Sequence, residues 1–127
     1  MKILLFGSLV VVAWASQYAP GVMEEVIANR QRWGQLPDPL PARIDGAIAV
    51  LECADVGKVI RLKPIGQERM ERFLVADCAR EDGGDGTRDW MVRRGILAEV
   101  DAGTAARWGA TGRLVRVTQL DRPSLVK

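Results

Sequence analysis

Histidine is absent from the chain, cysteine occurs only twice, and aromatic residues make up only 6% of it. Without histidine there is no histidine-ligated zinc site and no serine or cysteine triad of the usual kind, because these need an imidazole. Neither sign of charge dominates, because 18 Lys and Arg against 16 Asp and Glu leave a formal net charge of only +2. The molecule therefore carries no field strong enough to predict nucleic-acid binding, and neither a metal site nor another cofactor is predicted.

Long hydrophobic runs are also missing, except at the start of the chain. Met1-Lys2 gives a positive beginning, Ile3 to Ala13 is almost wholly apolar, and Ala13-Trp14-Ala15 is a small-x-small cleavage pattern. Residues 1–15 are therefore predicted to be a signal peptide, and residues 16–127 a single domain that is secreted, periplasmic or associated with the cell wall. A membrane span needs about 20 apolar residues, so an uncleaved anchor is the alternative, and no stable span is expected after cleavage.

If the protein is exported, its two cysteines are expected to form a disulfide. In an oxidising compartment, an even and minimal count favours one disulfide, between Cys53 and Cys78. It would close a loop of about 25 residues, which chain-entropy arithmetic values at roughly 3.5 kcal/mol. The alternative is a catalytic thiol, for which the chain offers no histidine as a base.

Short segments with strand character follow one another through the chain. The prolines between Leu36 and Pro41 force an extended loop or strap, and the segment from Tyr18 to Trp33 fits either a short helix or a loop. Apolar or alternating runs predict five strands, at residues 47–51, 58–63, 72–76, 96–100 and 114–120.

The last third also predicts a helix. Asp101 precedes the segment 102–108, and Gly109 follows it, which is typical of a two-turn helix with an acidic N-cap and a C-terminal glycine. The acidic and glycine-rich stretch 81–86 is predicted to be a flexible turn.

Three motifs in this order resemble a known family. They are an opening segment, Ala15-Ser16-Gln17-Tyr18-Ala19-Pro20-Gly21, a central Phe73-Leu74-Val75-Ala76-Asp77-Cys78, and Ala98-Glu99-Val100-Asp101 running through to Trp108-Gly109. Together they resemble the double-psi β-barrel of the rare-lipoprotein-A, expansin and barwin-like endoglucanase group. The resemblance covers nearly all of residues 16–127. It implies a mainly β fold, a six-stranded double-psi β-barrel with short helices, and a groove that relatives use on peptidoglycan or plant-wall polysaccharide.

The resemblance also implies roles for two aspartates. Asp101 matches the helix-start acid and would protonate a glycosidic oxygen, while Asp77 matches the strand-end acid and would be its charged partner. Each has a structural alternative, because Asp101 suits an N-cap and Asp77 can accept backbone hydrogen bonds after its strand. Lytic relatives carry an early glutamate and a histidine that this chain lacks, so their site is incomplete here.

Aromatic side chains are the candidate sugar-binding groups. Tyr18 matches the opening tyrosine of the family, and Trp33 and Trp90 lie in predicted loops, where a flat ring can stack on a sugar or pack against the protein. Trp108 is predicted to fill the core. Three functions follow: binding and cleavage of wall polysaccharide, binding or loosening without cleavage, and a structural interaction module.

Overall fold

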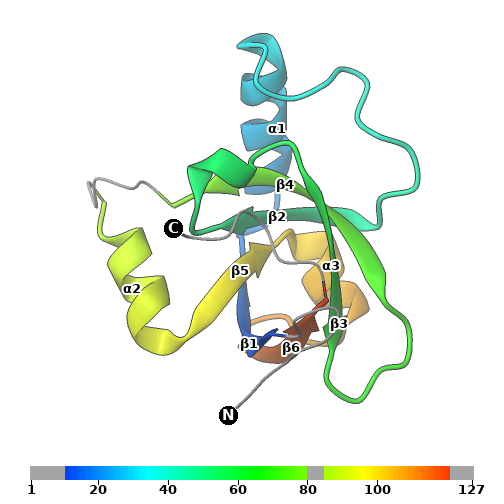
Figure 1. The fold of residues 1–127 in the computed structure, drawn as a ribbon, viewed down its shortest axis with the longest axis vertical. Coiled ribbons are helices and arrows are strands. Elements are labelled where there is room, and N and C mark those ends of the chain that lie inside the picture. The colour runs from blue at the N-terminus through cyan, green and yellow to red at the C-terminus, as the bar shows by residue number, and fades with distance from the viewer. Residues whose placement is uncertain (1–10, 80–84, 121–127) are drawn as a thin grey trace, which may run out of the picture.

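The computed structural model describes residues 11–79 and 85–120, and its six strands close into one barrel (Figure 1). These residues are mainly β, as predicted, and contain three short α-helices and one 3-10 turn. The strands are β1 (Val11–Gln17), β2 (Gly46–Val50), β3 (Val59–Pro64), β4 (Glu71–Cys78), β5 (Ile96–Val100) and β6 (Val115–Gln119). The helices are α1 (Val22–Arg32), α2 (Thr87–Arg94) and α3 (Ala102–Arg107), and the 3-10 turn is η1 (Cys53–Asp55).

The order of the strands around the barrel is β1-β5-β2-β4-β3-β6. The pairs β1–β5 and β2–β4 are parallel, and the other four pairs are antiparallel. A closed barrel of six strands with this mixed pairing is compatible with the double-psi arrangement. All five predicted strands are present, each within two residues of its predicted limits.

The inside of the barrel is filled by one cluster to which all six strands contribute. Phe73 and Val75 of β4 lie in this cluster with Ile48 and Val50 of β2, and all four are at most 3% exposed. Trp108, just after α3, completes the cluster and meets Phe73 edge to face at a ring distance of 5.8 Å. The prediction that Trp108 fills the core is therefore confirmed.

Helix α1 covers part of the outside of the barrel (Figure 1). Met23 of α1 is 1% exposed and packs with Ala47, Leu74 and Ala76, which come from β2 and β4. Two of these strand positions are alanines, which let the helix approach the sheet closely. The segment that fitted either a helix or a loop is thus a helix.

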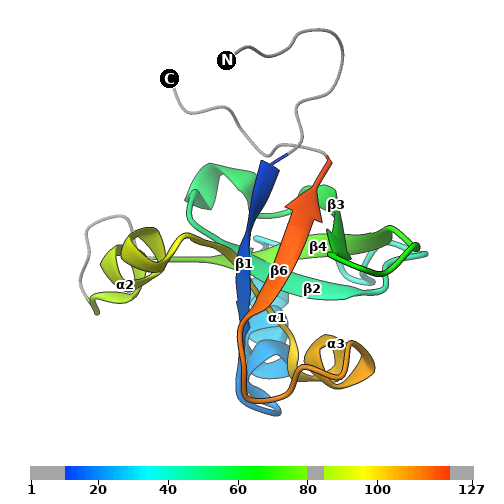
Figure 2. The same ribbon diagram turned by 90° about the horizontal axis from the view of Figure 1, so that it is seen from below.

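The first strand overlaps the segment predicted to be a signal peptide. β1 pairs with β5 on one side and with β6 on the other, and Figure 2 shows β1 and β6 lying side by side. A cut after Ala15 would fall inside this strand. In the part of the chain that the structure describes, no helix is long and apolar enough to cross a membrane.

Helix α2 and the segment before it bear on two predictions, the position of Trp90 and the turn at residues 81–86. Trp90 lies on α2, so its prediction as a loop residue was wrong. α2 begins directly after Gly86, where the chain takes a left-handed turn at φ 79°. Of the predicted turn 81–86, residues 81–84 lie outside the described residues.

Cys53 and Cys78 form a disulfide with an S–S distance of 2.03 Å, as predicted, which ties η1 to the end of β4. Both cysteines of the chain are used in this bond, so the alternative of a catalytic thiol was wrong.

Candidate functional site

A row of side chains crosses four neighbouring strands on the outside of the barrel. Ser16 of β1 is opposite Glu99 of β5, Glu99 is opposite Ala49 of β2, and Ala49 is opposite Asp77 of β4. Neighbouring strands lie about 4.8 Å apart, so the Cα atoms of Glu99 and Asp77 are separated by about 10 Å. The small side chain of Ala49 leaves the space between the two carboxylates open.

Asp77 reaches the outer face because β4 contains an irregularity. Val75 is opposite Ile48 and faces the barrel interior, and in a regular strand the side chain two positions later would face inward as well. The register shifts after Ile48, so that its neighbour Ala49 is opposite Asp77. One extra residue turns the following side chains to the other face, and this bulge places the carboxylate outside.

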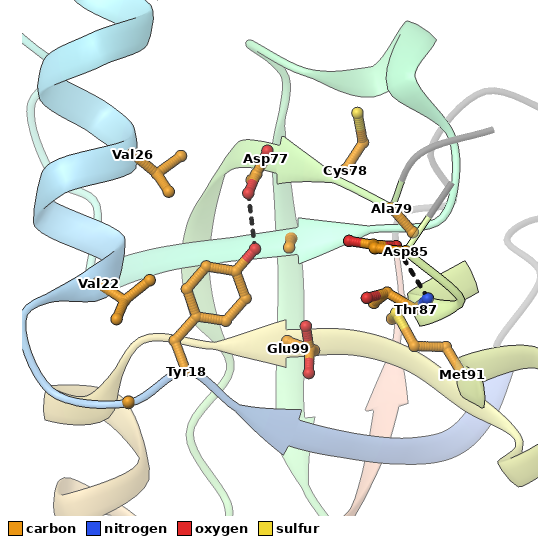
Figure 3. Close-up of a pocket in the computed structure, with 12 residues that line it drawn as sticks. Tyr18, Val22, Val26, Asp77, Cys78, Ala79, Asp85, Thr87, Met91 and Glu99 are labelled. Carbon is orange, nitrogen blue, oxygen red and sulfur yellow. Dashed lines mark hydrogen bonds between the residues drawn. The ribbon is translucent and has the colours of Figure 1, made fainter. Parts of the chain in front are cut away.

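Ala49, Asp77 and Glu99 of this row form the floor of a pocket of ≈ 420 Å³ between α1 and α2. Val22 and Val26 of α1 provide one wall, and Thr87 and Met91 of α2 provide the other. Figure 3 shows Tyr18, Asp77 and Glu99 directed into the same space from separate elements. The pocket therefore combines apolar walls, an aromatic ring and carboxylates.

Asp77 is held by two strong hydrogen bonds. Its Oδ1 accepts from Nη2 of Arg30 at 2.7 Å, and its Oδ2 accepts from the hydroxyl of Tyr18 at 2.7 Å. The Arg30 and Asp77 side chains are only 20% and 19% exposed, so their ion pair is partly shielded from solvent. Asp77 is thus a fixed carboxylate with its counterion on α1.

Tyr18 is a hydrogen-bond donor in this arrangement. Burial raises the pKa of its hydroxyl far above the ordinary value of 10.0, and the hydrogen bond to Asp77 and the negative charge of Asp77 raise it further. The hydroxyl therefore stays protonated at every pH near neutrality, and its proton points toward Asp77.

Glu99 has a different environment. Burial raises the pKa of its carboxyl, the negative charges of Asp77 and Asp85 act in the same direction, and the hydrogen bond from the Ser16 hydroxyl to Oε2, at 2.8 Å, opposes them. In the part of the chain that the structure describes, no ion pair involves Glu99. One pocket thus contains a carboxylate paired with arginine and a second carboxyl group that resists ionisation.

Asp101 lies elsewhere, at the start of α3. Its Oδ1 accepts from the Thr104 hydroxyl at 2.7 Å and from the Ala47 amide at 3.0 Å, and its Oδ2 accepts from the Thr104 amide at 3.2 Å. The N-cap prediction is confirmed. Asp101 lines a different hollow, of ≈ 270 Å³, beside Met23 and Asp45, so the structure does not bring it into the pocket of Asp77. Its catalytic role stays a prediction.

The two tryptophans predicted to contact sugar also lie away from the pocket lining. Trp33 follows α1 and is 64% exposed, and Trp90 packs partly against the protein with the Arg94 guanidinium 5.1 Å from its ring centroid. Of the three aromatic candidates, only Tyr18 lines the pocket. Sugar stacking by Trp33 or Trp90 stays a prediction.

Three residues at the pocket, Glu99, Arg30 and Ser16, were not predicted from the sequence as site residues. Glu99 could have been found from the period of two in β5, because it is a charged residue inside an otherwise apolar strand. Arg30 follows Val22 and Val26 at intervals of four, which puts all three on one face of a helix. Ser16 carried no such signal, because its position depends on β1 being a strand.

No family model matches this chain, and no curated protein matches it in sequence. Among the described residues, no group of three or more cysteine, aspartate or glutamate side chains is placed to hold a metal ion. The pocket and the motifs that resemble the family are therefore the features of this chain that bear on its function.

Proposed function

We propose that the protein is exported and binds a wall polysaccharide, peptidoglycan or a related glycan, in the pocket of Tyr18, Asp77 and Glu99. The observation that carries the proposal is the composition of this pocket. A sugar presents hydroxyl groups at its edges and C–H groups on its faces. Carboxylates can accept hydrogen bonds from the hydroxyls, while the apolar walls and the Tyr18 ring offer contact to the faces.

The rigidity of the pocket supports binding. Its floor consists of backbone-paired strands, and Arg30 and Tyr18 fix both oxygens of Asp77. A ligand then orders few side chains when it binds, which lowers the entropic cost of association. The pocket volume of ≈ 420 Å³ lies in the range usual for small-ligand sites, so it suits a short stretch of a glycan chain.

Two observations support export. The disulfide between Cys53 and Cys78 is consistent with an oxidising compartment, and the N-terminal sequence has a positive start followed by an apolar run. The resemblance of the motifs to wall-acting proteins agrees with this location.

The test is co-sedimentation of the purified protein with peptidoglycan sacculi, chitin and cellulose. We expect the protein to pellet with at least one polymer, and Val22→Asp, which adds a charge at the exposed rim of the pocket, to weaken pelleting about tenfold. Glu25→Gln changes an exposed side chain of the same helix outside the pocket and is the control.

Two outcomes would contradict the proposal. If the protein pellets with none of the three polymers, it is not a wall-glycan binder. If Trp33→Ala abolishes pelleting while Val22→Asp does not, binding occurs at the C-terminal end of α1 and the pocket is not the site.

A further inference from the structure

The register across β5, β2 and β4 sets two carboxyl groups on either side of one alanine. Glu99 and Asp77 both face outward from strands that flank β2, with Cα atoms about 10 Å apart. Enzymes that cleave glycosidic bonds use two carboxyl groups about 5 to 9.5 Å apart, on either side of the bond. Both side chains line the same pocket and are directed into it (Figure 3).

We infer that Glu99 is the proton donor for hydrolysis of a glycosidic bond held over Ala49, and that Asp77 is the fixed negative charge across from it. The inference rests on the proposed function, because it requires a glycan in this pocket. It reassigns the acid from Asp101, whose two oxygens are both occupied by Thr104 and Ala47 in the cap of α3.

The surroundings of each carboxyl group fit these roles. Arg30 and the Tyr18 hydroxyl hold both oxygens of Asp77 in place, whereas Glu99 receives a hydrogen bond from Ser16. Burial and the charges of Asp77 and Asp85 raise the pKa of Glu99, which keeps its proton available closer to neutral pH. Two carboxyl groups in such different environments are the usual pattern for an acid and its charged partner.

The reaction step balances with water as the only co-reactant. The proton of Glu99 moves to the glycosidic oxygen as the bond from this oxygen to the anomeric carbon breaks, and the leaving sugar departs with a hydroxyl group. The Asp77 carboxylate stabilises the positive charge that develops at the anomeric carbon. Water then adds to this carbon and gives a proton to Glu99, which restores the starting state.

The test uses the full chain with peptidoglycan sacculi, an N-acetylglucosamine hexamer and a glucose hexamer, in ordinary and in oxygen-18 water. We expect shortened products whose new reducing end contains one oxygen-18 atom. Glu99→Gln should lower the rate of cleavage per molecule of bound protein at least about 100-fold, because a general acid contributes about 100- to 10,000-fold. The rate of the unaltered protein should fall as the pH rises through the pKa of Glu99.

Glu25→Gln is the matched control, since it makes the same chemical change at an exposed position of α1. Glu99→Asp keeps an acid at the site and should retain part of the rate, which separates loss of the proton from loss of the fold. If the protein binds a glycan but yields no product, or if Asp101→Asn abolishes cleavage and Glu99→Gln does not, the inference is wrong while the proposed function stands. If no glycan binds, both are wrong.

Discussion

At the scale of single residues, the pocket separates two carboxyl groups by their partners. Asp77 has a cation and a phenol within hydrogen-bond distance, so its negative charge is compensated where it stands. Glu99 is partly buried, and among the described residues its hydrogen-bond partner is the Ser16 hydroxyl, which offsets only part of the desolvation cost of its ionisation. A carboxyl group in such an environment is a candidate functional residue.

The pKa of Glu99 leads to a prediction about stability. Because this pKa is raised above the ordinary value of 4.5, the folded state binds the proton more tightly than the unfolded state does. The stabilisation is therefore complete below about pH 4.5 and is lost as the pH rises through the pKa of the folded protein. Glu99→Gln should raise the melting temperature at about pH 8 by a few degrees, and the gain should shrink toward about pH 4.

Thermal melts of the unaltered protein and of Glu99→Gln across this pH range check the prediction. Glu25→Gln should show no such dependence, since its side chain is exposed. A difference in melting temperature that stays constant with pH would mean that the ionisation of Glu99 does not cause it.

At the scale of elements, the start of β2 and the start of α3 depend on each other. A Cβ atom at Gly46 would lie 2.4 Å from Oγ1 of Thr104 and 2.6 Å from Oδ1 of Asp101. Only glycine leaves room for the cap of α3 to contact the edge of the strand. Asp101 accepts from the backbone of both elements, so it joins the helix to the barrel.

Gly46→Ala should therefore destabilise the protein. The added methyl group must displace the capping side chains, and overpacking of this kind costs about 1–3 kcal/mol. Urea denaturation measures the change. Gly103→Ala is the matched control, because its Cβ meets only Oδ2 of Asp101, at 3.3 Å, and alanine favours the helix. Equal losses in the two variants would contradict the argument.

Much of the fold was predictable because its signals are local. The five later strands and α3 follow from short apolar runs, an acidic cap and a terminal glycine, all of which can be recognised within a few residues. β1 was missed because a strand paired on both sides is as apolar as the core of a signal peptide. α2 was missed because it is largely polar and follows a glycine-rich turn.

The site was less predictable because it depends on register. Asp77 was found as a strand-end acid, but its outward direction results from one extra residue in β4. The pairing of Glu99 with Ala49 joins two strands that are far apart in the sequence, and no local pattern encodes it. Asp101 was assigned to chemistry by family resemblance, whereas the structure shows how fully the α3 cap uses its carboxylate.

At the scale of the whole molecule, closure of the barrel depends on β1. This strand is parallel to β5 and antiparallel to β6. In the strand order of the described residues it lies between these two strands and so closes the ring. Ala15 also contributes to the interior cluster, and Ser16 binds Glu99. Loss of β1 would open the barrel, expose two strand edges and remove the hydrogen bond that Glu99 of the pocket floor accepts from Ser16.

A chain that begins at Ser16, the predicted mature start, should therefore fail to form the stable barrel. It lacks five of the seven residues of β1, Val11 to Ala15, and with them their hydrogen bonds to β6. A variant that lacks residues 1–10 keeps all of β1 and is the control. We expect cooperative thermal unfolding and protection of β5 and β6 amides from hydrogen exchange in the control, and neither in the shorter chain.

If the protein is exported and cut, mass spectrometry of the exported form should then find its first residue at or before Val11. A stable, cooperatively unfolding barrel made of residues 16–127 would show that closure does not need these five residues, and the cut after Ala15 would then be compatible with the fold.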